Sequence, residues 1–367
     1  MAKSVHLGVD GIARKVKKMY IGVDGVARKV KKAWIGVEGI ARLFFSGRGV
    51  LSYYGTATAL SVKRNNLSAV SVGNYALFGG GSGTDNFTTV DAYDKSLTQT
   101  TPTALSVGRS SLAAATVGDY ALFGGGRNSS GTNYTTVDAY DKSLTRTTPT
   151  ALSVKRNQLA AIAVGNYALF GGGAGGSASA IVDAYDTSLT RTIPTTLSAA
   201  RYRLAATTVG DYALFGGGYK SNFYTTVDAY DTSLTRTTPT ALSVAREYLA
   251  AATVGDYALF GGGAAGTIRY DTIEAYDKSL TQTVPTALSV ARNGLVATTV
   301  CDYALFGGGN TSAVVDAYDD SLTQTIADVL SVSRGNLAAA SVGDYALFGG
   351  GSSNTTRYDT VDVYQVI

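Results

Sequence analysis

The sequence Tyr75-Ala-Leu-Phe-Gly-Gly-Gly81 recurs letter for letter along the chain. Successive copies begin 45, 47, 45, 45, 46 and 42 residues apart. Seven copies at a nearly constant period indicate one supersecondary unit repeated in an array. The later copies begin at Tyr120, Tyr167, Tyr212, Tyr257, Tyr303 and Tyr345.

Each unit contains four short runs with β-propensity and no run with helical periodicity. In the first unit we expect strands at 67–72, 76–78, 88–93 and 97–101. Gly73-Asn74 predicts a two-residue hairpin turn between the first two strands, since such a turn needs residues that tolerate positive φ. Four strands in a unit of roughly 45 residues are typical of a propeller blade.

The array resembles a kelch-type β-propeller over residues 50–367. The matching features are Leu77-Phe-Gly-Gly80, the Tyr93-Asp94 pair and an arginine that opens each unit. The family usually has a tryptophan in the fourth strand, whereas this chain has Leu-Thr there and its only tryptophan is Trp34. The resemblance implies an all-β, seven-bladed propeller.

The two ends of the array complete each other. Residues 49–59 align with the fourth-strand stretch of the other units, and 361–367 form a third strand with no fourth after it. We expect Leu51–Thr56 to complete the blade formed by residues 334–367. Such a closure removes the exposed edges of an open sheet.

Residues 1–48 form a separate basic segment with a 14-residue period, and residues 49–367 form the propeller. The segment has eleven Lys and Arg against three acids, a net of +8 in a chain whose total is +4. Asp-Gly between β-branched residues predicts three small hairpins or one meander. Hairpins this small need a partner surface to be stable, so the segment is predicted to anchor the protein. Its anchoring candidates are Tyr20, Trp34, Lys17, Lys18, Lys31 and Lys32.

The repeated Gly-Val-(Asp/Glu)-Gly-(Ile/Val)-Ala-Arg wording of this segment resembles segments of virion and tail proteins of Firmicutes phages and prophages. The resemblance implies attachment to other virion proteins through residues 1–48, and localisation in a particle made in the bacterial cytoplasm. A basic nucleic-acid-binding arm is the alternative. The regular hairpin turns favour a folded docking element, so nucleic acid is not our expected partner.

Composition excludes several classes of function. Cys301 is the only cysteine, so an intrachain disulfide is excluded, and neither a membrane span nor a signal peptide is recognisable. Kelch-like propellers include copper radical oxidases, but the only histidine here is His6, which we expect to pack in a hairpin. The glycine tracts open no helix, so they are not phosphate loops. We therefore expect no enzyme, metal or cofactor.

Three charged columns recur with the period. Each arginine lies eleven residues before the tyrosine that begins its motif. Two roles are possible for these arginines: they pair with the recurring carboxylates between blades, or they form an anion-binding site at the mouth of the channel. A second aspartate column is expected to cap turns, with metal binding as the alternative. The arginines are Arg64, Arg109, Arg156, Arg201, Arg246, Arg292 and Arg334; their expected partners are Asp91, Asp138, Asp183, Asp228, Glu274, Asp316 and Asp362; the turn aspartates are Asp94, Asp141, Asp186, Asp231, Asp277 and Asp319.

The stretches between the glycines and the third strand vary in length and sequence, and all should emerge on one face. Variable loops on a rigid scaffold commonly carry recognition. The alternative is that these loops vary in sequence because no structural or functional constraint acts on them. The aromatic candidates for binding are Phe87, Tyr134, Tyr219, Tyr224, Tyr270 and Tyr358.

These observations favour a non-enzymatic phage structural protein of the tail or baseplate. The hairpins would anchor it, and the propeller would bind a host-surface glycan or protein. A capsid decoration protein, a cytosolic kelch-like interaction module and, more distantly, a glycan-active enzyme are the alternatives. Nearly identical blades argue against an enzyme, since catalysis needs a residue set that one blade has and the others lack.

Overall fold

The structure is a computed structural model, which describes six strands between residues 6 and 46 and the residues 49–310 and 312–367. The chain divides into two compact units, Met1–Leu51 with Val366–Ile367 and Ser52–Gln365. None of the described residues is in a helix. Across these residues, no helix is long and apolar enough to span a membrane.

The N-terminal strands pair as three separate antiparallel hairpins. Each of the described strands pairs with its neighbour in the chain, which favours three hairpins over one meander. The residues predicted to form the turns, 10–11, 24–25 and 38–39, lie outside the described residues. The strands are β1 (His6–Val9) with β2 (Ile12–Lys15), β3 (Met19–Val23) with β4 (Val26–Val30), and β5 (Lys32–Val37) with β6 (Ile40–Ser46). The anchoring side chains lie outside what the structure describes.

Seven four-stranded antiparallel sheets follow, as the repeat predicts. Blade 1 is β8 (Ser68–Val72), β9 (Tyr75–Gly79), β10 (Val90–Asp94) and β11 (Gln99–Thr100); blade 2 is β12 (Ala113–Val117), β13 (Tyr120–Gly124), β14 (Val137–Asp141) and β15 (Arg146–Thr147); blade 3 is β16 (Ala160–Val164), β17 (Tyr167–Gly171), β18 (Val182–Asp186) and β19 (Arg191–Thr192); blade 4 is β20 (Ala205–Val209), β21 (Tyr212–Gly216), β22 (Val227–Tyr230) and β23 (Arg236–Thr237).

Blades 5 to 7 complete the ring, and blade 7 takes its outer strand from the N-terminal side of the array. Blade 5 is β24 (Ala250–Val254), β25 (Tyr257–Gly261), β28 (Ile273–Asp277) and β29 (Gln282–Thr283); blade 6 is β30 (Val296–Val300), β31 (Tyr303–Gly307), β32 (Val315–Asp319) and β33 (Gln324–Ala327); blade 7 is β34 (Ala338–Val342), β35 (Tyr345–Gly349), β38 (Val361–Val366) and β7 (Leu51–Ala57); two short hairpins in loops are β26 (Ala264–Ala265) with β27 (Ile268–Arg269) and β36 (Ser352–Ser353) with β37 (Thr356–Arg357).

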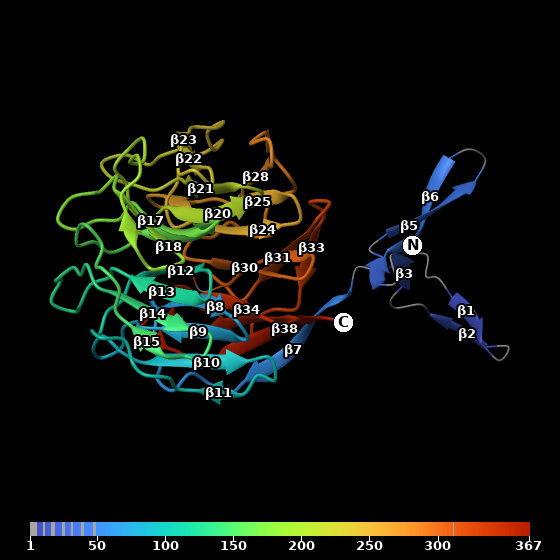
Figure 1. The fold of residues 1–367 in the computed structure, drawn as a ribbon, viewed down its shortest axis with the longest axis horizontal. Helices are drawn as coiled ribbons and strands as arrows, with labels where there is room; N and C mark the ends of the chain where they lie inside the picture. The colour runs from blue at the N-terminus through green and yellow to red at the C-terminus, as the bar shows by residue number, and fades with distance from the viewer. Residues whose placement is uncertain are drawn as a thin grey trace. The chain divides into compact units, whose positions relative to one another are not determined.

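The closing strand β7 lies beside β38, as Figure 1 shows where blue meets red. This confirms that an N-terminal strand completes the last blade. The Tyr53 hydroxyl donates to Asp362 Oδ1 at 2.7 Å, and its ring packs edge-on to Tyr364 with centroids 5.3 Å apart. Burial, helped by Asp362, raises the pKa of Tyr53 to about 12.

In blades 1 to 5 the fourth strand has two residues and is shorter than predicted. In blade 1 the strand begins at Gln99, while Leu97 lies in the preceding turn with φ +61°. Asp94 Oδ1 accepts hydrogen bonds from the backbone N–H groups of Ser96 and Thr98, which holds the chain in the turn. Equivalent bonds at the other five turn aspartates confirm the predicted capping role.

The hydrophobic core lies between adjacent blades, where the motif residues meet. Leu77, Phe78 and their equivalents are fully buried. A Cβ on Gly79 would lie 2.7 Å from the Phe123 ring of the next blade, so the first motif glycine is needed for this close approach. The Tyr93 hydroxyl also donates to the carbonyl of Thr58, at the end of the preceding blade's outer strand, at 2.7 Å.

Candidate functional site

The arginine and carboxylate columns form seven buried ion pairs, one per blade. Every member is at most 1% exposed. Six pairs have Nη2–Oδ2 distances between 2.5 and 2.8 Å, and Arg246 pairs with Glu274 through both carboxylate oxygens. Burial lowers the pKa of Arg64, Arg109, Arg156 and Arg201, and the paired carboxylate offsets part of this shift.

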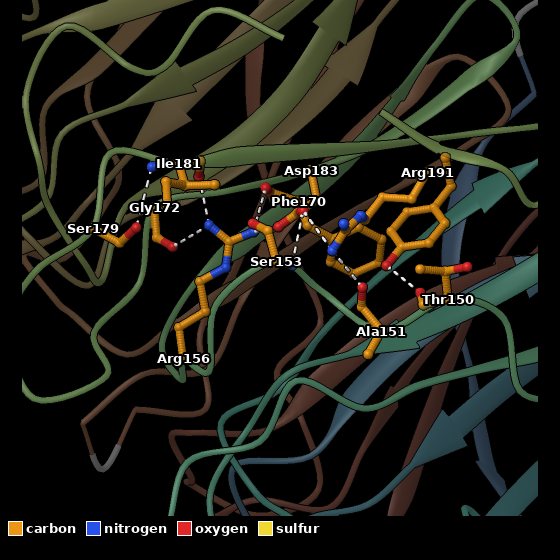
Figure 2. A network of polar contacts seen from close by, with 11 residues as sticks. Thr150, Ala151, Ser153, Arg156, Phe170, Gly172, Ser179, Ile181, Asp183 and Arg191 are labelled. Atoms are coloured by element: carbon orange, nitrogen blue, oxygen red, sulfur yellow. Dashed lines mark hydrogen bonds and ion pairs between the residues drawn. The ribbon is translucent and has the colours of Figure 1, made fainter. Parts of the chain in front are cut away.

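Figure 2 shows one of these networks, in blade 3. Arg156 Nη2 donates to Asp183 Oδ2 at 2.5 Å and to the Phe170 carbonyl at 3.0 Å. Its Nη1 donates to the carbonyls of Gly172 and Ile181. Both Nη atoms of the guanidinium group therefore have partners from its own blade, as a buried charge requires, whereas its Nε is buried without a hydrogen-bond partner.

The backbone of each arginine belongs to the preceding blade. The Arg156 carbonyl accepts from Gly126 N–H at 2.9 Å, and its N–H donates to the Tyr134 carbonyl at 3.2 Å. Each arginine thus connects two blades, the backbone to one and the guanidinium to the next. The geometry favours a structural role over an anion site, because fully buried and paired guanidinium groups offer no positive ring at the channel mouth. The ion pair itself lies within one blade, and the link between blades is made by the arginine backbone.

The loop aromatics do not gather into one site. Phe87, Tyr134 and their equivalents Tyr224, Tyr270 and Tyr358 are half-buried, and each N–H donates to the third motif glycine. Ser179 makes the same backbone bonds in blade 3. The position is therefore a fixed backbone anchor that does not require an aromatic side chain. Tyr219 alone among the predicted aromatics lies in a ring cluster, described below.

A closed ring of backbone hydrogen bonds surrounds the mouth of the channel. In each blade the residue two positions after the arginine donates its N–H to the carbonyl of its counterpart in the preceding blade, at 2.9 to 3.1 Å. All seven have left-handed backbones with φ between +52° and +64°. Six are not glycine, although this conformation costs such residues about 1–2 kcal/mol each. We call them the mouth residues: Asn66, Ser111, Gln158, Arg203, Tyr248, Gly294 and Asn336.

The mouth residues differ from blade to blade, although their backbones are equivalent. They line a cavity of about 260 Å³ whose floor is the ring of leucines that begins with Leu67. Below the leucines, a second cavity of about 280 Å³ is lined by small side chains such as Ala69 and Ala114. The chemical differences along the channel are therefore concentrated at the mouth, where the side chains of blades 1 to 3 are polar and uncharged and those of blades 4 and 5 are charged and aromatic.

Blades 4 and 5 place a cluster of four aromatic and two charged side chains at one side of the mouth. The Arg203 guanidinium lies 4.5 Å from the Tyr248 ring centroid and 5.1 Å from that of Tyr202. Its Nη1 donates to Glu247 Oε2 at 3.1 Å. Tyr202 packs edge-on to Tyr219 with centroids 5.7 Å apart, and Tyr219 packs against Phe223 at 5.0 Å.

The cluster is half-buried and electrostatically coupled. Burial acts to lower the pKa of Arg203, but Tyr248 and Glu247 outweigh it, so this pKa is raised. Burial raises the pKa of Tyr248, and the nearby Arg203 offsets part of that increase. The result is a charge-balanced platform of stacked side chains, which suits recognition of a ligand with apolar faces and polar edges.

Our sequence analysis missed this site because it took the loops after the glycines as the only variable stretches. The two positions between each arginine and the following leucine vary as strongly: Asn-Asn, Ser-Ser, Asn-Gln, Tyr-Arg, Glu-Tyr, Asn-Gly and Gly-Asn. That variation is a readable signal. Its meaning depends on ring closure, which brings seven separate positions to one mouth.

Comparisons with known proteins support the fold. No protein-family model matches the chain, and no curated protein matches it. The solved structure of YjhT is similar, with a TM-score of 0.61 and 15% identity, covering 74% of this chain and 99% of that one. Identity this low establishes the propeller fold alone. Among the described residues, no group of three or more His, Cys, Asp or Glu is placed to hold a metal ion.

Proposed function

We propose that this protein is a non-enzymatic binding component of a phage, or phage-derived, particle. The N-terminal hairpins attach it, and the channel mouth of the propeller binds a host-surface glycan or protein. One observation carries the binding role: in seven nearly identical blades, aromatic and charged side chains concentrate at one side of the mouth. Recognition of a ligand requires such a difference between blades, whereas the stability of the propeller does not.

The surroundings of Arg203 favour binding over catalysis. Its guanidinium is covered by two tyrosine rings and paired with Glu247, so both charges already have partners. The remaining mouth residues are neutral amides, a hydroxyl and a glycine. Such groups orient a ligand through hydrogen bonds, and the aromatic rings supply contact area.

The virion assignment is supported by the sequence of the 14-residue repeats, which resembles segments of virion and tail proteins of Firmicutes phages and prophages. The net charge of +8 over residues 1–48 sets this segment apart from the propeller. A tail or baseplate position is our first choice, with capsid decoration as the alternative. Isolated two-stranded hairpins are marginally stable in water, so a neighbouring sheet or subunit would stabilise them.

Residues 1–46 fused to an unrelated soluble domain should enter particles that lack the native protein. The physical reason is that hairpins bury their apolar face only by adding to a partner. Purified particles would be probed for the fusion, with the propeller without residues 1–46 as the matched comparison. Incorporation of the bare propeller while the fusion stays free would reverse the assigned roles.

Replacing Tyr248 with asparagine should weaken attachment to the host-cell surface about tenfold or more, as loss of a central aromatic contact does. The fold should survive, because Asn66 and Asn336 hold the same position and the same φ in other blades. Labelled propeller would be titrated onto Gram-positive cells. Unchanged attachment by a folded variant would remove the mouth from the proposal.

A further inference from the structure

The mouth cavity has a polar neighbour between the loops of blades 1 and 2. This polar cavity, which is distinct from the one below the leucines, measures about 320 Å³. It is lined by Asp85, Arg127, Asn128 and, from blade 7, Arg357. Ser129 Oγ donates to Asp85 Oδ1 at 3.3 Å, so the two loops are tied together. Asn128 Oδ1 accepts from Thr132 N–H and Ser130 Oγ, which fixes the second loop.

The two cavities share wall residues. Asn66 and Ser111 line both the polar cavity and the mouth, whereas Arg203 and Tyr248 line the mouth. Because the mouth residues follow one another round the ring, blades 1 and 2 are separated from blades 4 and 5 only by blade 3. An extended ligand that binds the aromatic cluster and crosses the mouth would therefore reach the polar cavity.

From this arrangement we propose that the ligand is a linear oligosaccharide lying across the mouth. One sugar would contact the aromatic cluster, and sugars further along the chain would contact the polar cavity. Sugar rings present apolar faces and hydroxyl edges, which match aromatic rings on one side and amides, hydroxyls and arginines on the other. A folded protein partner usually requires a much larger and flatter contact surface than two small concave cavities.

This inference rests on the proposed binding role and specifies its ligand. The chain itself provides matched variants for each half of the site. Arg127→Ser introduces the residue found at the equivalent Ser82 and Ser352. Tyr248→Asn introduces the residue of Asn66 and Asn336. Thr187→Lys, in an exposed turn at the opposite end of blade 3, reproduces Lys95 and Lys142 and serves as a control.

The experiment uses the full chain on an immobilised panel of linear glycans graded from monosaccharides to long oligosaccharides. Affinity should rise with chain length. Tyr248→Asn should lower it about tenfold at every length, and Arg127→Ser should lower it only for the longer chains. Thr187→Lys should match the native protein at every length.

Three results would overturn the inference: no glycan binding, binding independent of chain length, or an Arg127→Ser profile identical to the native one. Attachment to Gram-positive cells, measured in parallel, distinguishes failure of the oligosaccharide inference from failure of the proposed binding function. Cell attachment through the mouth without glycan binding would indicate a protein ligand and leave the proposed function standing. Loss of both would reject the function as well.

Discussion

Replacing Arg156 with alanine is expected to lower the free energy of unfolding by about 3–5 kcal/mol, because it leaves Asp183 buried without its close, buried charge partner. The change also removes the bonds to the carbonyls of Phe170, Gly172 and Ile181. Proteins are commonly stable by only about 5–15 kcal/mol, so this loss is a large share of the total. Urea unfolding followed by circular dichroism measures it.

Arg191→Gln is the matched control for this change. Arg191 Nη1 lies 3.7 Å from the same Asp183, but its side chain is 24% exposed and blades 1, 5 and 6 have glutamine at the equivalent position. We expect a loss below about 1 kcal/mol. A double variant, Arg156→Met with Asp183→Leu, should be more stable than Arg156→Ala, since no charge is left unpaired. Equal stability of Arg156→Ala and Arg191→Gln would contradict a structural role for the buried pair.

Deleting residues 1–57 is expected to destabilise the propeller far more than deleting residues 1–46. The longer deletion removes β7, exposes the edge of β38 and leaves Asp362 without the Tyr53 hydroxyl. A loss of several kcal/mol corresponds to a melting temperature lower by roughly 5–10 °C or more. The shorter deletion leaves β7 in place.

Thermal melts of the two truncated proteins, at equal concentration, provide the comparison. Light scattering should also detect association of the longer deletion, because an open ring presents an unpaired strand edge. Coincident melts would show that strand closure contributes little to the stability of the ring.

Much of the fold could be predicted from the repeat. The Tyr-Ala-Leu-Phe-Gly-Gly-Gly motif predicted the blades, and the third strand near Val361, which no fourth strand follows, predicted the closing strand. Pairing of Arg64 with Asp91 could be predicted because every repeat has one arginine and one carboxylate at these two positions. Each of these features is local or repeats with the sequence period, which is why a single sequence reveals them.

The remaining features depend on three-dimensional closure. Leu97 is apolar and was expected to begin a strand, but Asp94 holds it in a left-handed turn. The cluster at Tyr202, Arg203 and Tyr248 joins positions about 45 residues apart that nothing local connects. The side chains that make the candidate site are therefore placed by the ring as a whole.

The hydrogen-bond ring at the mouth has a consequence for how this protein can evolve. Every mouth N–H and carbonyl is already engaged with a neighbouring blade, so a ligand there is addressed by side chains alone. Asparagine, serine, glutamine, arginine, tyrosine and glycine all satisfy the same backbone geometry within this one chain. If the mouth binds a ligand as proposed, its specificity can change by single substitutions at these positions while the scaffold stays constant.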